Sequence, residues 1–168
     1  SVLCLPFRNP VLNAKTITTL DALSGGRIDF GIGTGWMREE FEGVFADYES
    51  RGSMTDEHLE FFKIASTQDV PEFAGEHFSV SGKVFFPRPV QKPYPPIWVG
   101  GKTEAALRRV ATYGDYWNGI FVTPVDVKER LGRLAELCEE RGRDPSDIGA
   151  AITMNLNLTE RAMENGER

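Results

Sequence analysis

The sequence has few of the residues that mark metal-bound or disulfide-stapled proteins. Its 168 residues include two cysteines and two histidines, and His58 and His77 show no metal-ligand spacing. Two cysteines are too few for a disulfide framework, so we expect Cys4 and Cys138 to be reduced thiols that fill apolar space in a cytoplasmic protein. No metal site is predicted.

Long apolar runs and an excess of positive charge are also missing. No run approaches the roughly 18 residues that cross a bilayer, and no basic-then-apolar leader opens the chain. The net charge is −6, with both signs mixed along the sequence. We therefore expect no membrane partner, no nucleic-acid partner and no export. The composition, 40% hydrophobic and 26% charged, is ordinary for a globular protein, and the length indicates one domain over residues 1–168.

The fingerprint of dinucleotide-binding folds is absent as well. Gly31, Gly33 and Gly35 stand at alternate positions, but the motif G-x-G-x-x-G needs a glycine where this sequence has Trp36. This counts against a doubly wound nucleotide-binding module.

The stretch on which the rest depends is residues 24–40, SGGRIDFGIGTGWMREE. Gly25 and Gly26 are typical of a helix end, and residues 27–32 read as a buried strand. Three glycines then bare the end of that strand, just before a helix begins at Met37. Such glycines are typical of a tight turn, but a bared strand end leading into a helix N-terminus is also where α/β proteins bind phosphates.

A second stretch repeats this arrangement. Residues 97–99 read as an apolar strand, Gly100 and Gly101 end it, and Lys102 and Thr103 begin a helix. Amides at a helix N-terminus, together with a hydroxyl and an ammonium group, suit a phosphate.

Strands and helices alternate along the chain, which predicts parallel βαβ units. Residues 70–96 hold six of the ten prolines and are predicted to be an excursion, with a small hairpin and an extended arm. Five strands fit a doubly wound sheet, whereas a complete (β/α)8 barrel needs eight strands and about 250 residues. The expected strands are 1–5, 27–32, 97–99, 115–120 and 148–156, the hairpin pieces are 77–80 and 83–86, and the expected helices are 10–23, 37–45, 53–66, 102–111 and 124–141.

Three motifs, LDALSGGR, GIGTGW and PPIWVGG, occur in an order and spacing that resemble the luciferase-like monooxygenase family. The resemblance covers residues 1–145 and is closest to the deazaflavin-dependent oxidoreductase branch. It implies an α/β fold that is a partial (β/α)8 TIM barrel. The chain would be an internal fragment, incomplete at both ends, that runs from about strand 3 to strand 7, with the proline-rich excursion before strand 5.

The resemblance also implies a cofactor, reduced FMN or coenzyme F420, bound at the carboxyl ends of the strands. A bulge in the third strand would support the ring, the loop after the fourth strand would lie near the ribityl-phosphate arm, and the loop after the fifth would bind the phosphate. The positions that match are, in that order, Ser1 and Val2; Thr34, Gly35 and Trp36; and Gly100, Gly101, Lys102 and Thr103.

The implied function is that of an oxidoreductase. With FMN, the reduced cofactor reacts with dioxygen and a small-molecule substrate is oxygenated; with F420, the cofactor carries a hydride. A flavin reductase and a homo-oligomer of the full-length protein are the implied partners. The catalytic residue is unknown, and we do not assign Asp21, Asp29 or Asp115 to that role. The alternative is a non-catalytic luciferase-like subunit or an inactive fragment.

The remaining conspicuous residues are interpreted as structural. We expect Asp21 and Arg27 to form a helix-to-strand ion pair or cap, and Trp98 and Trp117 to lie in the core. Trp36 is the aromatic residue that we expect to face a ligand. A local charge cluster is expected between Arg51, Asp56 and Glu57.

Overall fold

The structure is a computed structural model of the chain and describes residues 2–153. Its main sheet has five parallel strands, and a second sheet is an antiparallel pair. The main strands are β1 (Leu3–Cys4), β2 (Phe30–Gly33), β5 (Ile97–Gly100), β6 (Tyr116–Ile120) and β7 (Gly149–Thr153), and the small sheet is formed by β3 (Phe73–Ala74) and β4 (Ser79–Val80).

The order of the strands decides between the two architectures that the sequence left open. Strands lie side by side in chain order, β1-β2-β5-β6-β7, and every neighbouring pair is parallel. A doubly wound sheet reverses its strand order at a switch point, whereas a barrel adds each new strand to the same edge. The described residues therefore form part of a (β/α)8 barrel, as expected.

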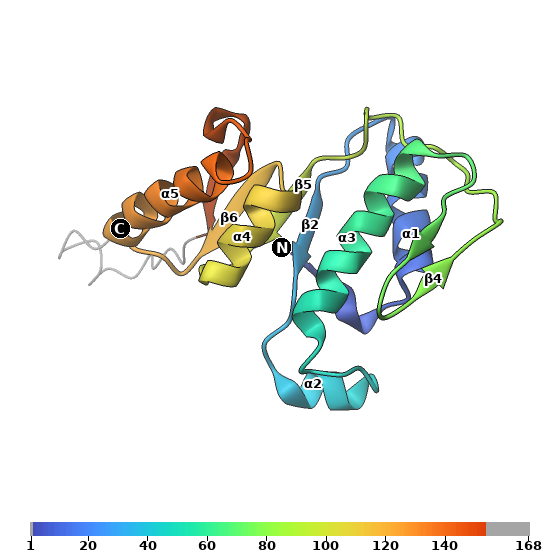
Figure 1. The fold of residues 1–168 in the computed structure, drawn as a ribbon, viewed down its shortest axis with the longest axis horizontal. Coiled ribbons are helices and arrows are strands. Elements are labelled where there is room, and N and C mark those ends of the chain that lie inside the picture. The colour runs from blue at the N-terminus through green and yellow to red at the C-terminus, as the bar shows by residue number, and fades with distance from the viewer. Residues whose placement is uncertain (1, 154–168) are drawn as a thin grey trace, which may run out of the picture.

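The helices connect these strands and cover one face of the sheet. Figure 1 shows α1 and α3 on one side of the molecule and α4 and α5 on the other, in pairs that pack together. Within the described residues, no helix is long and apolar enough to cross a membrane. The helices are α1 (Pro10–Ser24), α2 (Arg38–Gly43), α3 (Arg51–Thr67), α4 (Glu104–Tyr113) and α5 (Pro124–Glu139), with single 3-10 turns η1 (Leu5–Phe7) and η2 (Pro145–Asp147).

Capping residues fix where the helices begin and end. The Asn9 side chain accepts a hydrogen bond from the Leu12 amide at 3.1 Å, and Pro10 occupies the first turn of α1, as predicted. Gly25 ends that helix in the left-handed conformation, with φ of 68°. Thr103 caps α4 by accepting from the Ala106 amide at 3.2 Å.

The strand pattern separates two faces of the sheet. Ile32 of β2 and Val99 of β5 are buried against the helices. The residues that alternate with them along each strand turn to the opposite, concave face. On β5 that alternation places Trp98 and Gly100 on the concave face. The core therefore lies between the sheet and its helices, and the concave face is free to line a site.

Several predicted boundaries are wrong by a few residues. The second strand begins at Phe30, where the Phe30 amide donates to the Pro96 carbonyl at 2.8 Å, and not at residue 27. Helix α3 begins at Arg51, so Ser53 lies inside it instead of capping it. The predicted hairpin paired residues 77–80 with 83–86, but β4 pairs with β3, and 83–86 form no strand. Residues 154–156 of the last predicted strand lie outside the described residues.

Of the predicted ion pair or cap at Asp21 and Arg27, the ion pair is wrong, whereas Arg27 does cap the end of α1. The Asp21 carboxylate is fully buried and accepts hydrogen bonds from the Gln91 amide at 3.0 Å and the Gln91 side chain at 2.8 Å. Arg27 instead donates from Nε to the Ser24 carbonyl. Asp21 thus fastens the proline-rich excursion to α1, a contact over 70 residues that no local pattern in the sequence indicates.

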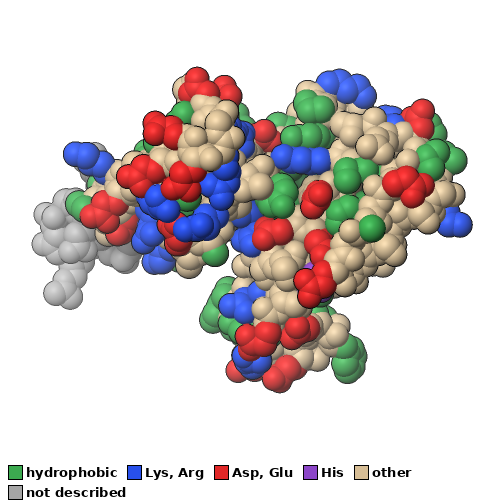
Figure 2. Space-filling model, in the orientation of Figure 1, with side chains coloured by type: hydrophobic (Ala, Val, Ile, Leu, Met, Phe, Trp, Pro, Cys, Tyr) green, Lys and Arg blue, Asp and Glu red, His purple; other side chains and the backbone are tan. Residues whose placement is uncertain are grey.

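The predicted cluster of Arg51 with Asp56 and Glu57 is also wrong. Residues five and six apart on a helix point to different faces, because neighbours on one face are three or four apart. Asp56 pairs with Arg109 of α4, and Glu57 accepts the amides of the β3–β4 turn. Figure 2 shows acidic and basic side chains intermingled on the face it displays.

Buried His58 is expected to make the fold sensitive to acid. Only 5% of the residue is exposed, its ring packs edge-on against Phe78, and its Nδ1 has no hydrogen-bond partner. Burial lowers the pKa of His58 to about 4, although Glu57 opposes the shift. Between pH 6.5 and 4 the unfolded chain therefore binds a proton that the folded chain does not, and the free energy of unfolding is expected to fall by about 3 kcal/mol.

Urea unfolding at pH 7 and pH 4.5 measures this loss. His58→Phe is expected to remove most of the difference between the two pH values, and His77→Gln is the control that should retain it. An equal pH dependence in wild type and His58→Phe would contradict the assignment.

Candidate functional site

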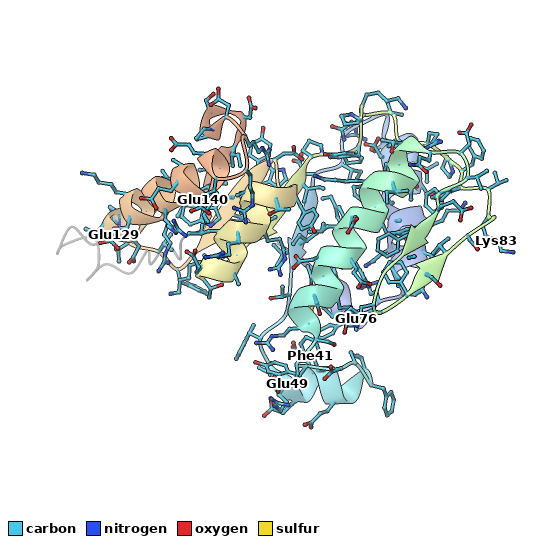
Figure 3. All side chains as sticks on the ribbon, in the orientation of Figure 1. Phe41, Glu49, Glu76, Lys83, Glu129 and Glu140 are labelled. Carbon is cyan, nitrogen blue, oxygen red and sulfur yellow. The ribbon has the colours of Figure 1, made fainter. Side chains whose placement is uncertain are left out.

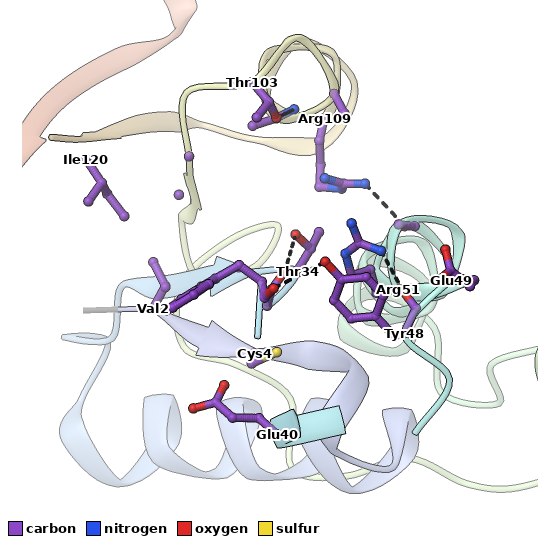
Figure 4. A pocket seen from close by; sticks show the side chains of 18 residues that line it. Val2, Cys4, Thr34, Glu40, Tyr48, Glu49, Arg51, Thr103, Arg109 and Ile120 are labelled. Atoms are coloured by element: carbon purple, nitrogen blue, oxygen red, sulfur yellow. Dashed lines mark hydrogen bonds between the residues drawn. The ribbon is translucent and has the colours of Figure 1, made fainter. Parts of the chain in front are cut away.

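A cavity of about 630 Å³ lies at the carboxyl ends of β1, β2 and β5 (Figure 4). Its walls come from the loop after β2, the loop after β5, and the first turns of α3 and α4. The lining residues are Val2, Cys4, Gly33, Thr34, Gly35, Trp36, Glu40, Tyr48, Glu49, Arg51, Gly52, Gly100, Gly101, Thr103, Ala105, Ala106, Arg109 and Ile120.

The structure brings most of the predicted site residues to this one cavity. Thr34 and Thr103, from the two glycine-containing loops, lie on the same end of the sheet and not on opposite ends. Ser1 lies outside the described residues. The predicted residues that line the cavity are Val2, Thr34, Gly35, Trp36, Gly100, Gly101 and Thr103.

Lys102 departs from the predicted arrangement. Its side chain is not among those that line the cavity, and Nζ donates to the Phe121 carbonyl at 3.3 Å. Binding of a phosphate by the Lys102 ammonium group stays a prediction, and the backbone of Lys102 lies between Gly101 and Thr103, which both line the cavity.

The N-terminus of α4 offers hydrogen-bond donors to the cavity. The Thr103 side chain uses its oxygen to accept from Ala106, and the amides of Glu104 and Ala105 precede the first residue that can find an acceptor within the helix. Ala105 and Ala106 line the cavity and bring no large side chain to it. This end of α4 carries the positive pole of the helix and suits an anion.

Arg51 is the functional candidate that sequence reasoning missed. Its Nη1 donates to the Tyr48 carbonyl at 2.7 Å and its guanidinium lies 3.8 Å from the centre of the Tyr48 ring. Among the described residues it forms no ion pair, so its charge is available to a ligand. The feature of the sequence that could have indicated this role is the position of Arg51 at the start of a long helix, directly before Gly52.

Arg109 holds the two helix starts together. It is buried and donates from Nε to Asp56 at 2.5 Å and from Nη2 to the Gly52 carbonyl at 3.2 Å. The Asp56 carboxylate balances its charge. Arg109 therefore positions the first turn of α3 beside α4, and leaves Arg51 as the cation of the cavity without a carboxylate partner in the described chain.

Glu49 and the Cys4 thiol are poor candidates for a free base or a nucleophile, whereas Glu40 also lines the cavity and forms no ion pair among the described residues. Glu49 is paired with Arg38. Burial, and then the nearby charge of Glu40, raises the pKa of the Cys4 thiol to about 11. Cys4 is consequently neutral near pH 7, when a reactive cysteine would need to be a thiolate. This agrees with its interpretation as an apolar filler, now placed in a cavity wall.

Gly35 lines the cavity, and the close packing around it also requires a glycine at this position. Its φ is 78°, and a Cβ there would lie 2.7 Å from both Cys4 Sγ and a ring carbon of Phe41. Phe41 is fully buried and packs edge-on against Phe7 and Tyr48, which anchors the α2 segment (Figure 3). The glycine is therefore required where the loop passes over the thiol and the ring.

Gly35→Ala is expected to destabilise the protein by about 2 to 4 kcal/mol, because it combines a left-handed backbone with an overpacked contact. Chemical denaturation measures the loss. Gly43→Ala is the matched control, since a Cβ at Gly43 meets nothing within 4 Å and its backbone is helical. Equal stability of the two variants would contradict this role for Gly35.

Two aromatic rings stack on the concave face, outside the set of residues that line the cavity. Trp98 and Tyr116 stack with ring centres 4.2 Å apart and planes 7° apart. Trp98 is half-buried and faces the barrel interior, so its assignment to the core is wrong, whereas Trp117 is fully buried as predicted. The difference follows from the strand period, which turns these two residues to opposite faces.

A group of potential metal ligands lies elsewhere in the molecule. Glu57, Glu76 and His77 place ligand atoms within 4.8 Å of one another. The Glu57 carboxylate already accepts the amides of Glu76 at 2.6 Å and His77 at 3.0 Å. These bonds fasten the β3–β4 turn to α3 and explain the arrangement without a metal ion.

Comparison with known proteins places this site in a family. The profile described as luciferase-like monooxygenase matches residues 1–165. The chain belongs to the luciferase-like monooxygenase family. The resemblance seen in the three motifs is thereby confirmed.

The curated relatives of this chain include uncharacterised mycobacterial proteins. Rv0940c of Mycobacterium tuberculosis (strain H37Rv) is 37% identical over 142 residues, which cover 84% of this chain and 48% of the relative. The chain thus spans about half the length of the curated relatives it matches.

Solved structures of luciferase-like proteins share the fold. Monooxygenase RslO1 from Streptomyces bottropensis superposes with a TM-score of 0.83 at 23% identity, over 98% of this chain and 51% of that one. An F420-dependent secondary alcohol dehydrogenase, in complex with an F420-acetone adduct, gives 0.77 at 24% identity, over 90% and 47%. Long-chain alkane monooxygenase LadA gives 0.81 at 19% identity, over 98% and 44%. The partial barrel is therefore confirmed.

Proposed function

We propose that this chain carries the phosphate-binding part of the cofactor site of a flavin- or deazaflavin-dependent oxidoreductase. The observation that carries the proposal is that a helix N-terminus and an arginine without an ion-pair partner among residues 2–153 meet at one cavity, at the carboxyl ends of parallel barrel strands. Catalytic sites of barrel enzymes lie at this end of the strands.

The residues present fit a phosphate monoester or diester. The Thr103 oxygen already accepts from Ala106, which leaves its O–H free to donate, and the amides of Glu104 and Ala105 are unused by the helix. Arg51 supplies a charge and several N–H donors. These groups would hold the phosphate of the cofactor.

The cavity wall at the ends of β2 and β5 fits the flat ring of such a cofactor. Gly33 and Gly100 approach Val2 so closely that a Cβ on either would lie about 3 Å from a Val2 methyl group: 3.1 Å for Gly33 and 2.9 Å for Gly100. Side chains at these two positions would displace Val2, so the backbone of the two strand ends stays bare beside it. Trp36, with 76% of its surface exposed at the mouth of the cavity, is the aromatic residue that would cover a bound ligand.

A bound cofactor would supply the redox chemistry, by electron transfer toward dioxygen from reduced FMN or by hydride transfer from F420. The residues of this chain would bind, orient and shield it. Solved relatives support both cofactor classes, since one holds an F420-acetone adduct and another, a riboflavin lyase, holds modified FMN. The expected partners are a small-molecule substrate, a flavin reductase for the FMN case, and a second copy of the full-length protein.

Titration of the full-length protein with FMN and with F420 tests the proposal. We expect one of the two cofactors to bind with a dissociation constant in the micromolar range or below. Quenching of the cofactor fluorescence measures the binding. Failure to bind either cofactor would overturn the proposal and favour the alternative of a non-catalytic luciferase-like subunit.

A further inference from the structure

The hydrogen-bond partner of buried Trp117 lies in a loop that lines the cavity. The residue is fully buried on the helix-covered face of β6, among core residues that include Val110 and Leu137. Its indole Nε1 nevertheless reaches the end of the neighbouring strand and donates to the Gly101 carbonyl at 2.7 Å. A buried indole N–H needs an acceptor, and here that acceptor is the carbonyl of a glycine that lines the cavity, which couples the core to the site.

The Gly101 peptide is held from two sides. The Gly101 amide donates to the Asn118 carbonyl at 3.1 Å, while its own carbonyl accepts from Trp117. Its φ is 128°, which side chains rarely allow, and a Cβ there would lie 3.0 Å from the Ala106 methyl group. Two bonds and a glycine-specific conformation therefore fix the direction of this peptide.

The direction of that carbonyl determines the direction of the next amide. The bond between Gly101 and Lys102 is trans, so the Lys102 N–H points opposite to the Gly101 carbonyl. Trp117 draws the carbonyl toward the helix-covered face. The Lys102 N–H therefore points away from the core, between Gly101 and Thr103, which both line the cavity. In the part of the chain that the structure describes, this amide donates to no group.

We propose that Trp117 is a positioning residue for the phosphate site: its indole N–H sets the Gly101–Lys102 peptide so that the Lys102 amide is presented to the cofactor phosphate. The inference rests on the proposed function. It gives Lys102 a role through its backbone, although its side chain is turned away. Trp117, which lies outside the cavity, would then contribute to ligand preference. The site would favour a phosphorylated ligand over its phosphate-free counterpart partly through this residue.

The test compares the two ligands in wild type and in variants of the full-length protein that lack this N–H. FMN and riboflavin are the probes, and F420 with its phosphate-free deazaflavin chromophore replaces them if wild type binds F420. Trp117→Phe removes the donor, and replacement of Trp117 by 3-benzothienylalanine removes it while keeping the bicyclic shape. Trp98→Phe is the matched control, because the indole Nε1 of Trp98 is buried without a partner.

Loss of the N–H is expected to weaken binding of the phosphorylated ligand about tenfold, the effect of one hydrogen bond to a charged group, and to leave the phosphate-free ligand unchanged. Trp98→Phe should leave the ratio of the two affinities unchanged. An unchanged ratio in the folded benzothienylalanine variant, or an equal loss for both ligands, overturns the inference while the proposed function stands. A wild type without preference for the phosphorylated ligand overturns both.

Discussion

Arg51→Gln is expected to weaken binding of the phosphorylated cofactor about 10- to 100-fold, with little effect on folding. A hydrogen bond to a charged group contributes about 1.5–3 kcal/mol, and Arg51 is the cation at the cavity that has no carboxylate partner among the described residues. Its packing on the Tyr48 ring makes a smaller contribution to the fold. Titration with FMN or F420, at low and high salt, measures the loss.

The matched control for Arg51 is Arg27→Gln. Arg27 is also an arginine that donates to a backbone carbonyl three residues away, but it lies outside the cavity. Its replacement should leave cofactor affinity unchanged. The phosphate assignment would be wrong if the two variants bound equally well, or if Arg51→Gln weakened riboflavin as much as FMN.

Asp21→Ala is expected to lower the free energy of unfolding by about 2 to 3 kcal/mol, because it removes a buried carboxylate that accepts two part-buried hydrogen bonds from Gln91. The proline-rich excursion would then be fastened to α1 less firmly. Burial by itself would raise the pKa of Asp21, but the hydrogen bonds from Gln91 and nearby backbone amides outweigh it and lower the pKa. Chemical denaturation measures the loss at neutral pH.

The lowered pKa of Asp21 also fixes the sign of its pH dependence. Its contribution is fully present above the pKa of the unfolded chain, near 4, and is lost as pH falls below that value through the folded pKa. Asp29→Ala is the control, since Asp29 is exposed and its change should stay within about 0.5 kcal/mol. A comparable loss in both variants would contradict the anchoring role of Asp21.

Local features of the fold were predictable because their causes are local. Asn9 before Pro10, and Gly25 after the last turn of α1, mark a helix by capping chemistry that needs no distant partner. The two glycine-ended strands likewise predicted loops at one end of a parallel sheet, because parallel strands share a direction. The structure places those loops, with Thr34 and Thr103, at one cavity.

Contacts between distant segments were not predictable from one sequence. Asp21 meets Gln91, Asp56 meets Arg109, and the indole of Trp117 meets Gly101 only because the barrel brings their elements together. Local spacing suggested nearer partners for the two carboxylates and was wrong. Arg51 was predicted to join a charge cluster and not to bind a ligand, for the same reason. Only the three-dimensional structure shows that it has no carboxylate partner among the described residues.

The measurement that tests the account most directly is a crystal structure of the full-length protein with its bound FMN or F420. We predict that the phosphate lies within hydrogen-bond distance of the Thr103 hydroxyl and the first amides of α4, with the Arg51 guanidinium beside it. A cofactor whose phosphate lies at another part of the barrel, with this cavity holding only water, would contradict the account.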